Sequence, residues 1–354
     1  MIFDFFKKEK PSRPAVLLIY TGGTIGMKED PADGTLKPFD FSSLMDEVPE
    51  LRKFGLTIDS FSFSPIIDSS DVEPSLWQSL ANLIKERYDD YCGFVVLHGT
   101  DTMAYSASAM SFMLDNLNKP VVFTGSQLPI GQPRTDGKEN LISAVEIASA
   151  RDQHGHSLVP EVCICFNAKL FRGNRSTKVN ATGFDAFDSP NYPPLATAGI
   201  SIKYNGGFIH YPRDRKKALS IRTDLDTRVS ILKLHPGITE QAVRDILLGD
   251  GSRAVILETY GAGNAPSKPW FLKIVREACG KGKILLNVTQ CLGGDVDMDI
   301  YATGRTLKEA GVVSGYDITT ESALGKLFHL MGNYDDNGKV KALLEMNLKG
   351  EISK

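Results

Sequence analysis

Short apolar runs alternate with helical segments along the first part of the chain, and this alternation restricts the possible folds more than any other feature. The runs at residues 14–20, 93–99, 119–125 and 161–166 have the length of strands, and helical patterns of ten or more residues separate several of them. Strands that are apolar on both faces must be covered on both faces. We therefore expect a doubly wound, mainly parallel α/β sheet in the N-terminal part of the chain.

The alternation lapses in the middle of the chain. Residues 205–226 are polar, glycine-containing and charged, which is typical of a linker, here with an edge hairpin. Beyond them the strand and helix patterns resume, and 354 residues are enough for two domains. We predict a larger catalytic α/β domain over residues 1–205, a linker over 206–226 and a smaller α/β domain over 227–354.

The bulk composition excludes several classes of function. The formal net charge is -3, so the chain has no basic surplus for nucleic acid or an anionic membrane. The first residues lack the apolar region of a signal peptide, and no apolar window reaches the length of a membrane span. The five cysteines are widely spaced and odd in number, which indicates reduced thiols, and no zinc-ligand spacing occurs. We expect a cytoplasmic protein with no metal, no nucleic-acid partner and no membrane contact.

Four polar clusters follow predicted strands. They are "TGGTIG" at 21–26, "DSSD" at 68–71, "HGTDT" at 98–102 and "FRGNRSTK" at 171–178. Loops at the carboxyl ends of parallel strands converge on the ligand crevice of an open α/β sheet. The four clusters are therefore expected to form one site.

The clusters supply the groups that acyl transfer to a threonine needs. A threonine hydroxyl is a weak nucleophile at neutral pH, so it needs a base within hydrogen-bond reach and a third group to orient that base. Thr100, Asp101 and Lys178 are candidates for this set, and the N–H groups of the glycine turn are candidates for holding an oxyanion. Thr21, at the start of the turn, is expected to be a turn or packing residue.

Each cluster also has a purely structural interpretation. In this interpretation, the Gly-Gly pair at residues 22–23 simply allows positive φ angles and close packing of the next element. Thr100 or Asp101 can cap the helix that follows, and Lys178 can be a solvated surface lysine. His98 is expected to pack or to orient a neighbour instead of acting as the base.

In combination and in this order, a set of segments resembles the bacterial L-asparaginases, and within them the cytoplasmic type I group. The segments are "YTGGTIGM", "DSSD", "HGTDTMAYSASA", "KPVVFTGSQLP", "RGNRSTK", "YGAGNAP" and "NVTQC". The resemblance implies an amidohydrolase that converts L-asparagine to L-aspartate and ammonia without a cofactor. It also implies a homotetramer built as a dimer of dimers.

The resemblance implies roles for individual residues as well. Thr24 matches the nucleophile that forms a β-aspartyl acyl-enzyme, and the second catalytic set matches Thr100, Asp101 and Lys178. The segment that holds the α-amino and α-carboxylate groups of the substrate matches Asp68, Ser69 and Ser70, with Thr100 and Asp101 also lining the substrate. Asn264 matches a residue that reaches the active site of the neighbouring subunit.

Two departures from the resemblance affect these roles. Many bacterial members carry a tyrosine in a mobile lid shortly after the glycine turn, but here the corresponding residues 28–39 contain none, and Thr35 stands in its place. Tyr301 is a candidate replacement from the C-terminal domain.

The second departure concerns regulation. In some type I enzymes asparagine also binds an allosteric pocket, which matches Thr177 and Cys291 here, but Glu258 stands where that pocket has an arginine. A carboxylate repels the α-carboxylate of an effector, so we expect weak or absent cooperativity.

Other functions remain open at this stage. An L-glutaminase or the amidase subunit of a transfer-RNA amidotransferase shares the motifs, although the near-neutral charge argues against RNA. A non-enzymatic module that binds an amino acid or a nucleotide is a further alternative. The "TGGTIG" turn lacks the G-x-G-x-x-G spacing of dinucleotide-binding proteins, and the chain has no phosphate-binding P-loop motif.

Overall fold

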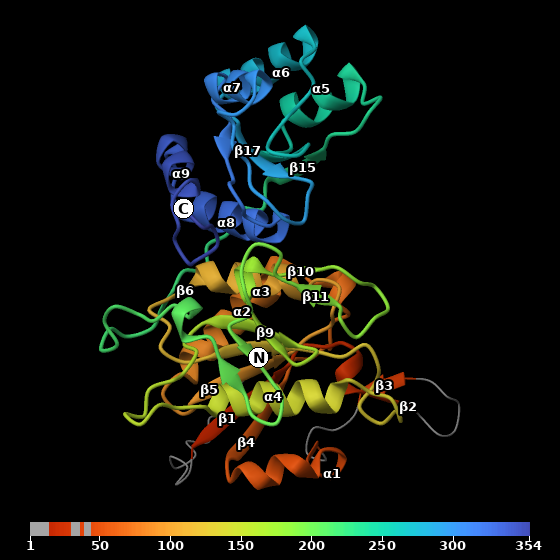
Figure 1. Cartoon of the computed structure of the whole chain (residues 1–354), viewed down its shortest axis with the longest axis vertical. Helices are drawn as coiled ribbons and strands as arrows, with labels where there is room; N and C mark the ends of the chain where they lie inside the picture. Colours follow the sequence, from red (N-terminus) through yellow and green to blue (C-terminus); the bar gives the residue numbers. More distant parts are fainter. Residues whose placement is uncertain (1–13, 30–35, 39–43) are drawn as a thin grey trace.

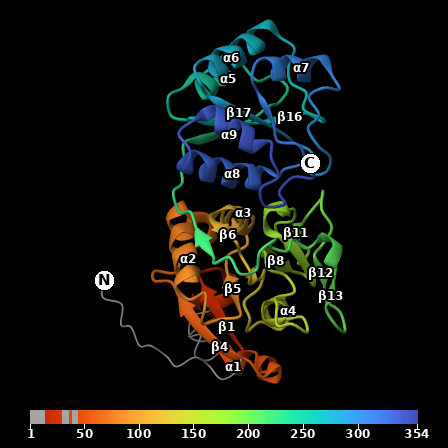
Figure 2. The same cartoon turned by 90° about the vertical axis from the view of Figure 1, so that its left-hand side faces the viewer.

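The computed structural model describes residues 14–29, 36–38 and 44–354, which form two α/β domains stacked one above the other (Figure 1, Figure 2). The N-terminal domain holds an eight-stranded sheet and the C-terminal domain a four-stranded one. The expectation of a larger, mainly parallel α/β domain followed by a smaller one is confirmed. Thr35 and most of the predicted lid lie outside the described residues.

The strands at the centre of the N-terminal sheet are parallel and buried. The sheet contains β1 Ala15–Tyr20, β4 Thr57–Ser62, β5 Gly93–Leu97, β7 Val121–Thr124, β8 Val162–Phe166, β9 Lys169–Arg172, β12 Ala196–Thr197 and β13 Lys203–Tyr204. Their order is β13-β12-β9-β8-β7-β5-β1-β4. The strands from β4 to β8 pair in parallel, so their carboxyl ends share one edge of the sheet.

Helices cover both faces of this sheet, as its apolar strands require. Leu17 and Ile19 of β1 pack with α2 Pro74–Glu86 and α3 Met103–Met113, whereas Val16 and Leu18 pack with α4 Gly137–Ser149 on the other face. Successive side chains of a strand point to opposite faces. Each apolar strand therefore contributes to two cores, which is the doubly wound arrangement.

The C-terminal domain repeats this architecture on a smaller scale. Its parallel sheet has the order β15-β16-β17-β18, with β15 Val229–Lys233, β16 Ala254–Thr259, β17 Ile284–Thr289 and β18 Val313–Ser314. The outer face carries α5 Glu240–Leu248, α6 Pro269–Gly280 and α7 Ala302–Glu309. The face toward the N-terminal domain carries α8 Thr320–Asn333 and α9 Asn337–Leu344.

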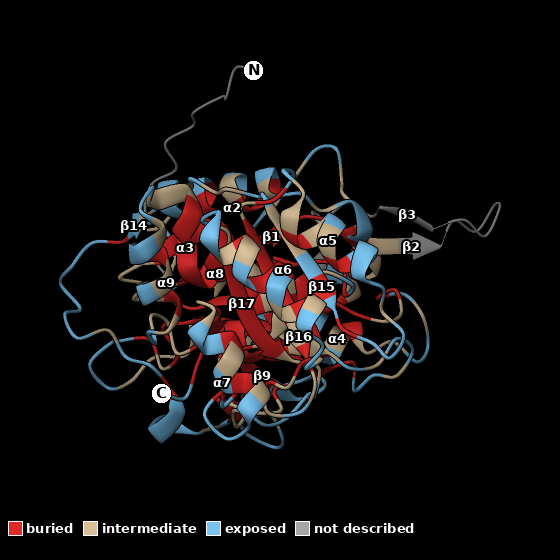
Figure 3. Ribbon diagram, turned by 90° about the horizontal axis from the view of Figure 1, so that it is seen from above, coloured by how far each residue is buried: buried red, intermediate tan, exposed pale blue. Residues whose placement is uncertain are grey.

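The two domains meet where α3 packs against α8. All residues of α3 except Tyr105 are buried, and Figure 3 shows the α3 ribbon in the colour of buried residues. Small side chains permit this approach, because a Cβ added to Gly325 of α8 would lie only 3.1 Å from the Ala109 nitrogen of α3. The C-terminal domain therefore covers α3, the helix that follows the loop after β5.

The remaining elements are short. They are α1 Leu44–Glu47, the antiparallel pairs β2 Met27–Glu29 with β3 Leu36–Pro38, β6 Leu114–Asp115 with β14 Ser220–Ile221, and β10 Thr177–Lys178 with β11 Phe187–Asp188, and the 3-10 turns η1 Thr24–Gly26, η3 Pro49–Phe54, η4 Ser69–Asp71, η5 Gly173–Arg175 and η6 Gly206–Phe208. The edge hairpin predicted within residues 205–226 is wrong, because β14 pairs with β6 at the end of α3 instead. Among the described residues, no helix is both long and apolar enough to span a membrane.

Candidate active site

Three loops at the carboxyl edge of the N-terminal sheet contact one another through glycines. A Cβ added to Gly22 would lie 1.9 Å from the Ile67 carbonyl oxygen, one on Gly23 would lie 2.5 Å from the Gly99 Cα, and one on Gly99 would lie 2.5 Å from the Ser69 Cβ. Any side chain at these positions would separate the loops. The glycines therefore bring together the turn after β1, the turn after β4 and the loop after β5.

Thr24 follows these contacts as the first residue of η1. Its side chain is partly exposed, and among the described residues no hydrogen bond involves its hydroxyl. Thr21 differs, because it is buried and its hydroxyl donates to the Leu97 carbonyl oxygen at 3.0 Å. The two threonines of the turn are thus distinct: Thr21 holds the turn to β5, and the Thr24 hydroxyl remains available.

Thr100, Asp101 and Lys178 form a hydrogen-bonded set, as the sequence predicted. The Lys178 ammonium donates to Thr100 Oγ1 at 2.8 Å and to Asp101 Oδ1 at 2.7 Å. Thr100 is buried, the Lys178 side chain is only 17% exposed, and Asp101 is open to solvent. Lys178 reaches the loop after β5 from the short strand β10, so it is not a solvated surface lysine.

The capping interpretation of the "HGTDT" cluster is wrong. The residue that caps α3 is Thr102, with no side-chain capping bond, and its hydroxyl donates to the Ser69 carbonyl oxygen at 2.6 Å. The side chains of Thr100 and Asp101 therefore do not cap α3 and bond to Lys178 instead, and Thr102 ties the loop after β5 to the turn after β4.

His98 is buried in a chain of three hydrogen bonds. Trp77 Nε1 donates to Ser106 Oγ at 2.8 Å, the Ser106 hydroxyl lies 2.9 Å from His98 Nε2, and His98 Nδ1 lies 2.6 Å from the Gly99 carbonyl oxygen. A carbonyl can only accept, so Nδ1 carries the proton and Nε2 accepts from Ser106. Burial lowers the pKa of His98 to about 4. The neutral imidazole orients the loop that carries Thr100, as the sequence analysis expected, and does not face the site as a base.

Asp68, Ser69 and Ser70 form the turn after β4. The Asp68 carboxylate accepts hydrogen bonds from the Ser70 N–H and hydroxyl, both at 2.9 Å, and these bonds lower the pKa of Asp68. Asp68 and Ser70 are exposed, whereas Ser69 is buried against Gly99. The arrangement presents an ionised carboxylate at the same edge as Thr24 and Thr100.

The residues predicted to line a regulatory pocket do share a cavity between the domains. Thr177, Glu258 and Cys291 line it, and its volume is about 230 Å³. The Thr177 hydroxyl donates to Glu321 Oε1 at 2.6 Å, and burial raises the pKa of Glu321. Glu258 accepts from the Thr320 hydroxyl at 2.7 Å. Two glutamates therefore line this cavity.

Asn264 and Tyr301 both belong to the C-terminal domain, and Asn264 contacts α7, the helix that begins directly after Tyr301. Asn264 Oδ1 accepts from the Thr303 hydroxyl at 2.8 Å, and Tyr301, two residues earlier, is 52% exposed directly before α7. In both views α7 lies on the side of the C-terminal domain away from the N-terminal domain. Among the described residues of one chain, no hydrogen bond joins the Asn264 or Tyr301 side chain to Thr24, Thr100 or Lys178.

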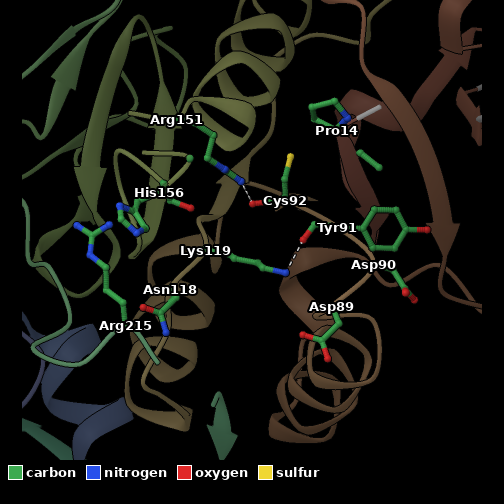
Figure 4. A pocket seen from close by; sticks show the side chains of 13 residues that line it. Pro14, Asp89, Asp90, Tyr91, Cys92, Asn118, Lys119, Arg151, His156 and Arg215 are labelled. Carbon is green, nitrogen blue, oxygen red and sulfur yellow. Dashed lines mark hydrogen bonds between the residues drawn. The ribbon is translucent and has the colours of Figure 1, made fainter. Parts of the chain in front are cut away.

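A second cavity, of about 420 Å³, opens at the amino ends of β1, β5 and β7 (Figure 4). Two of its cations, Lys119 and Arg151, are hydrogen-bonded to backbone carbonyls. Lys119 donates to the carbonyl oxygens of Tyr88 and Tyr91, just beyond the end of α2, and Arg151 donates to those of Cys92 and Ala150, close to the end of α4. Cations at helix C-termini satisfy unpaired carbonyls and the helix dipole. These groups stabilise the fold and leave the carboxyl edge as the candidate active site.

The described residues contain no group of three or more histidine, cysteine or acidic side chains arranged to hold a metal ion. Sequence reasoning missed Trp77 and Ser106, which orient His98. Both lie in helices as ordinary core positions, so no local pattern distinguishes them.

Fold and site define a class of two-domain α/β proteins whose larger sheet carries threonine, lysine and aspartate groups at its carboxyl edge. A family model described as "Asparaginase, N-terminal" matches residues 15–209, and one described as "Glutaminase/Asparaginase C-terminal domain" matches residues 228–344. The chain belongs to the asparaginase family.

Individual relatives cover nearly the whole chain. It is 41% identical to L-asparaginase 1 of Escherichia coli K12, over 96% of this chain and 98% of that protein. It is 40% identical to the human 60 kDa lysophospholipase, over 96% of this chain and 61% of that protein. The crystal structure of L-asparaginase I from Vibrio cholerae superimposes with a TM-score of 0.86 at 39% identity, covering 97% of this chain and all of that one.

Proposed function

We propose that the chain is an L-asparaginase, an amidohydrolase that converts L-asparagine and water to L-aspartate and ammonia. The observation that carries the proposal is the contact of Gly23 with Gly99, because it sets the residue before Thr24 against the residue before Thr100. The Thr24 hydroxyl and the Thr100–Lys178–Asp101 set then lie at one edge of the sheet. Membership of the asparaginase family and the similarity to L-asparaginase 1 of E. coli support the same activity.

Charged groups at the edge fit the backbone end of the substrate. The exposed Asp68 carboxylate, whose hydrogen bonds from Ser70 keep it ionised, accepts the α-ammonium of asparagine together with Asp101. Ser69 and Ser70 flank the position of the α-carboxylate. The side-chain amide then lies between Thr24 and Thr100.

Hydrolysis proceeds in two steps. The Thr24 oxygen attacks the amide carbon, the C–N bond breaks, and the nitrogen leaves as ammonia with the proton from the Thr24 hydroxyl, which leaves a β-aspartyl ester on Thr24. Water then attacks that ester and releases aspartate, and its proton restores the Thr24 hydroxyl. The Lys178 ammonium, 2.8 Å from Thr100 Oγ1, stabilises negative charge that develops on that oxygen. Thr100 can therefore relay the proton: its oxygen takes up the proton of the attacking water while its own hydroxyl proton passes to the Thr24 oxygen.

The active site is completed by a second copy of the chain. Asn264 is bonded to Thr303 of α7, and Tyr301 directly precedes that helix. Because α7 lies on the side of the C-terminal domain away from the N-terminal domain, both residues are expected to serve a site across a subunit interface. The side chains of Ile300 and Tyr301, adjacent in sequence before α7, are 55% and 52% exposed, and exposed large apolar residues are what such an interface buries. Tyr301 of one subunit then assists Thr24 of another, and the assembly is a homotetramer formed as a dimer of dimers.

Cooperativity with asparagine is weak or absent. Glu258 lines the inter-domain cavity, and its carboxylate repels the α-carboxylate of an effector. The protein acts in the cytoplasm, which its five free cysteines support. It requires no cofactor.

Ammonia release from L-asparagine and L-glutamine tests the proposal. We expect saturable ammonia release from asparagine by the wild-type protein and its loss in the Thr24→Ala variant. The two substrates differ by one methylene, which a pocket discriminates by about 1–3 kcal/mol, so a slower reaction with glutamine is also expected. Release from glutamine alone would identify a glutaminase, and release from neither substrate would refute the proposal.

A further inference from the structure

The turn that carries Lys178 is held by the far end of the chain. It comprises β9, η5 and β10, and the residues between Arg172 and Lys178 contact the C-terminal tail, which we define as residues 347–354. The tail follows α9 and belongs to the C-terminal part of the chain, yet it lies against the N-terminal domain (Figure 2).

Arg175, Asp317 and Ser353 form a closed ring of polar contacts. The Arg175 side chain is 1% exposed, and its guanidinium pairs with Asp317 Oδ2 at 2.7 Å and donates to Ser353 Oγ at 3.1 Å. Ser353 in turn donates its N–H and its hydroxyl to Asp317, at 2.8 and 2.5 Å. Burial alone would raise the pKa of Asp317, but the bonds from Ser353 and Arg175 outweigh it and hold the pKa below its usual value. These bonds hold the buried guanidinium of Arg175 in one orientation.

The same turn meets the tail at further points. Arg175 Nε donates to the Gly350 carbonyl oxygen at 2.7 Å, and Asn174 Nδ2 donates to the Lys349 carbonyl oxygen at 3.0 Å. Gly350 has φ +80, and a Cβ there would lie 2.4 Å from Arg172 Nη1. The tail backbone is therefore fitted closely to the turn.

The tail is itself fixed to the C-terminal domain. Lys326 of α8 pairs with Glu351 at 2.6 Å, and both side chains are fully buried. The Glu351 carboxylate also accepts the N–H groups of Leu348 and Lys349 at 2.6 to 3.1 Å. A buried, fully hydrogen-bonded ion pair resists displacement, because breaking it leaves an uncompensated charge.

Little freedom remains between Arg175 and Lys178. Ser176 is buried and its hydroxyl donates to the Arg172 carbonyl oxygen at 2.7 Å, and Thr177 is held by Glu321. We propose that the C-terminal tail is a clamp that positions Lys178 against Thr100 through the ring of Arg175, Asp317 and Ser353. The inference rests on the proposed role of Lys178 in asparagine hydrolysis. Arg175, Asp317 and Ser353 are positioning residues, since none of them belongs to the set that meets the substrate.

Steady-state kinetics of tail variants test the clamp. Ser353→Ala removes the hydroxyl that bonds to both Arg175 and Asp317 and keeps the backbone bond to Asp317. Arg175→Lys keeps the positive charge and removes the planar guanidinium with its several donors. Because a displacement of about 1 Å at a reacting group costs up to about 100-fold in rate, we expect kcat to fall about tenfold or more, with KM within about twofold. Lys354→Ala is the matched control, since Lys354 is exposed and bonds only to Tyr316 within the described chain. It is expected to leave kcat unchanged.

A double variant separates positioning from general destabilisation. If Ser353 acts through Lys178, adding Ser353→Ala to Lys178→Met leaves kcat where Lys178→Met alone puts it. A further fall in the double variant, or an unchanged kcat in both Ser353→Ala and Arg175→Lys, would overturn the clamp. An unchanged kcat in Lys178→Met would instead overturn the role of Lys178 in the proposed function, so the two failures are distinct.

Discussion

The contact between Gly23 and Gly99 gives the sharpest quantitative expectation. A Cβ placed on Gly23 would lie 2.5 Å from both the Cα and the nitrogen of Gly99 and 2.9 Å from the His98 carbonyl carbon. Carbon atoms in contact lie about 3.5–4.0 Å apart, so the Gly23→Ala variant must separate the two loops by about 1 Å. All three atoms belong to the backbone, so the clash cannot be relieved by moving a flexible side chain.

The two loops that would move apart carry Thr24 and Thr100, so the distance between these threonines would increase. A displacement of about 1 Å at reacting groups costs on the order of 100-fold in rate, and we expect Gly23→Ala to lower kcat by about this factor. Gly23 also has φ 92 and ψ 167, a region open almost only to glycine, so the variant loses a further 1–3 kcal/mol, roughly, of folding stability.

Ammonia release and thermal unfolding measured side by side separate these two effects. The matched control is Gly155→Ala, because Gly155 has φ +80 and no atom within 4 Å of an added Cβ. We expect the control to lose stability and to keep its kcat. A Gly23→Ala variant with kcat close to wild type would refute the argument that this contact sets the spacing of the two threonines.

Three further expectations concern catalysis, regulation and stability. Lys178→Met should lower kcat by about 10²- to 10⁴-fold, because it removes the ammonium beside Thr100, while Lys169→Met, an exposed change on the neighbouring strand, should leave ammonia release intact. Asparagine saturation should be hyperbolic because Glu258 lines the inter-domain cavity; a sigmoidal curve that Cys291→Ala abolishes would contradict this. Burial lowers the pKa of both His98 and His329 from 6.5 to about 4, so the unfolded chain binds protons first as the pH falls, and each histidine should lower the free energy of unfolding by about 2 kcal/mol between pH 7 and pH 5. Denaturant unfolding at the two pH values should show a smaller loss in His329→Leu than in the wild type, and an equal loss would refute this explanation.

The parts of the fold that follow from local patterns were predictable. The runs that became β1, β5, β7 and β8 are apolar on both faces, and such strands have few alternatives to a covered parallel sheet. The proximity of Thr100 and Lys178 was also predicted. Strand direction alone does not produce it, because β9, which precedes Lys178, runs antiparallel to β8 and is not adjacent to β5.

The parts that depend on distant pairings were not predictable. The stretch 205–226 was expected to form its own hairpin, but β14 pairs with β6, more than a hundred residues earlier, because two-residue strands carry no periodic signal. Trp77 orients His98 through Ser106, and Ser353 reaches Arg175 across 178 residues. Such contacts require the tertiary fold, and no pattern within the neighbouring residues encodes them.

The central claim is that Thr24 carries the acyl group, and acid quenching during turnover tests it most directly. The wild-type protein would be mixed with excess L-asparagine, quenched in acid, digested and analysed by peptide mass spectrometry. We expect the mass of one aspartyl group on the peptide that contains Thr24, and its absence from the Thr24→Ala variant. An aspartyl group on the peptide that contains Thr100 would contradict the account.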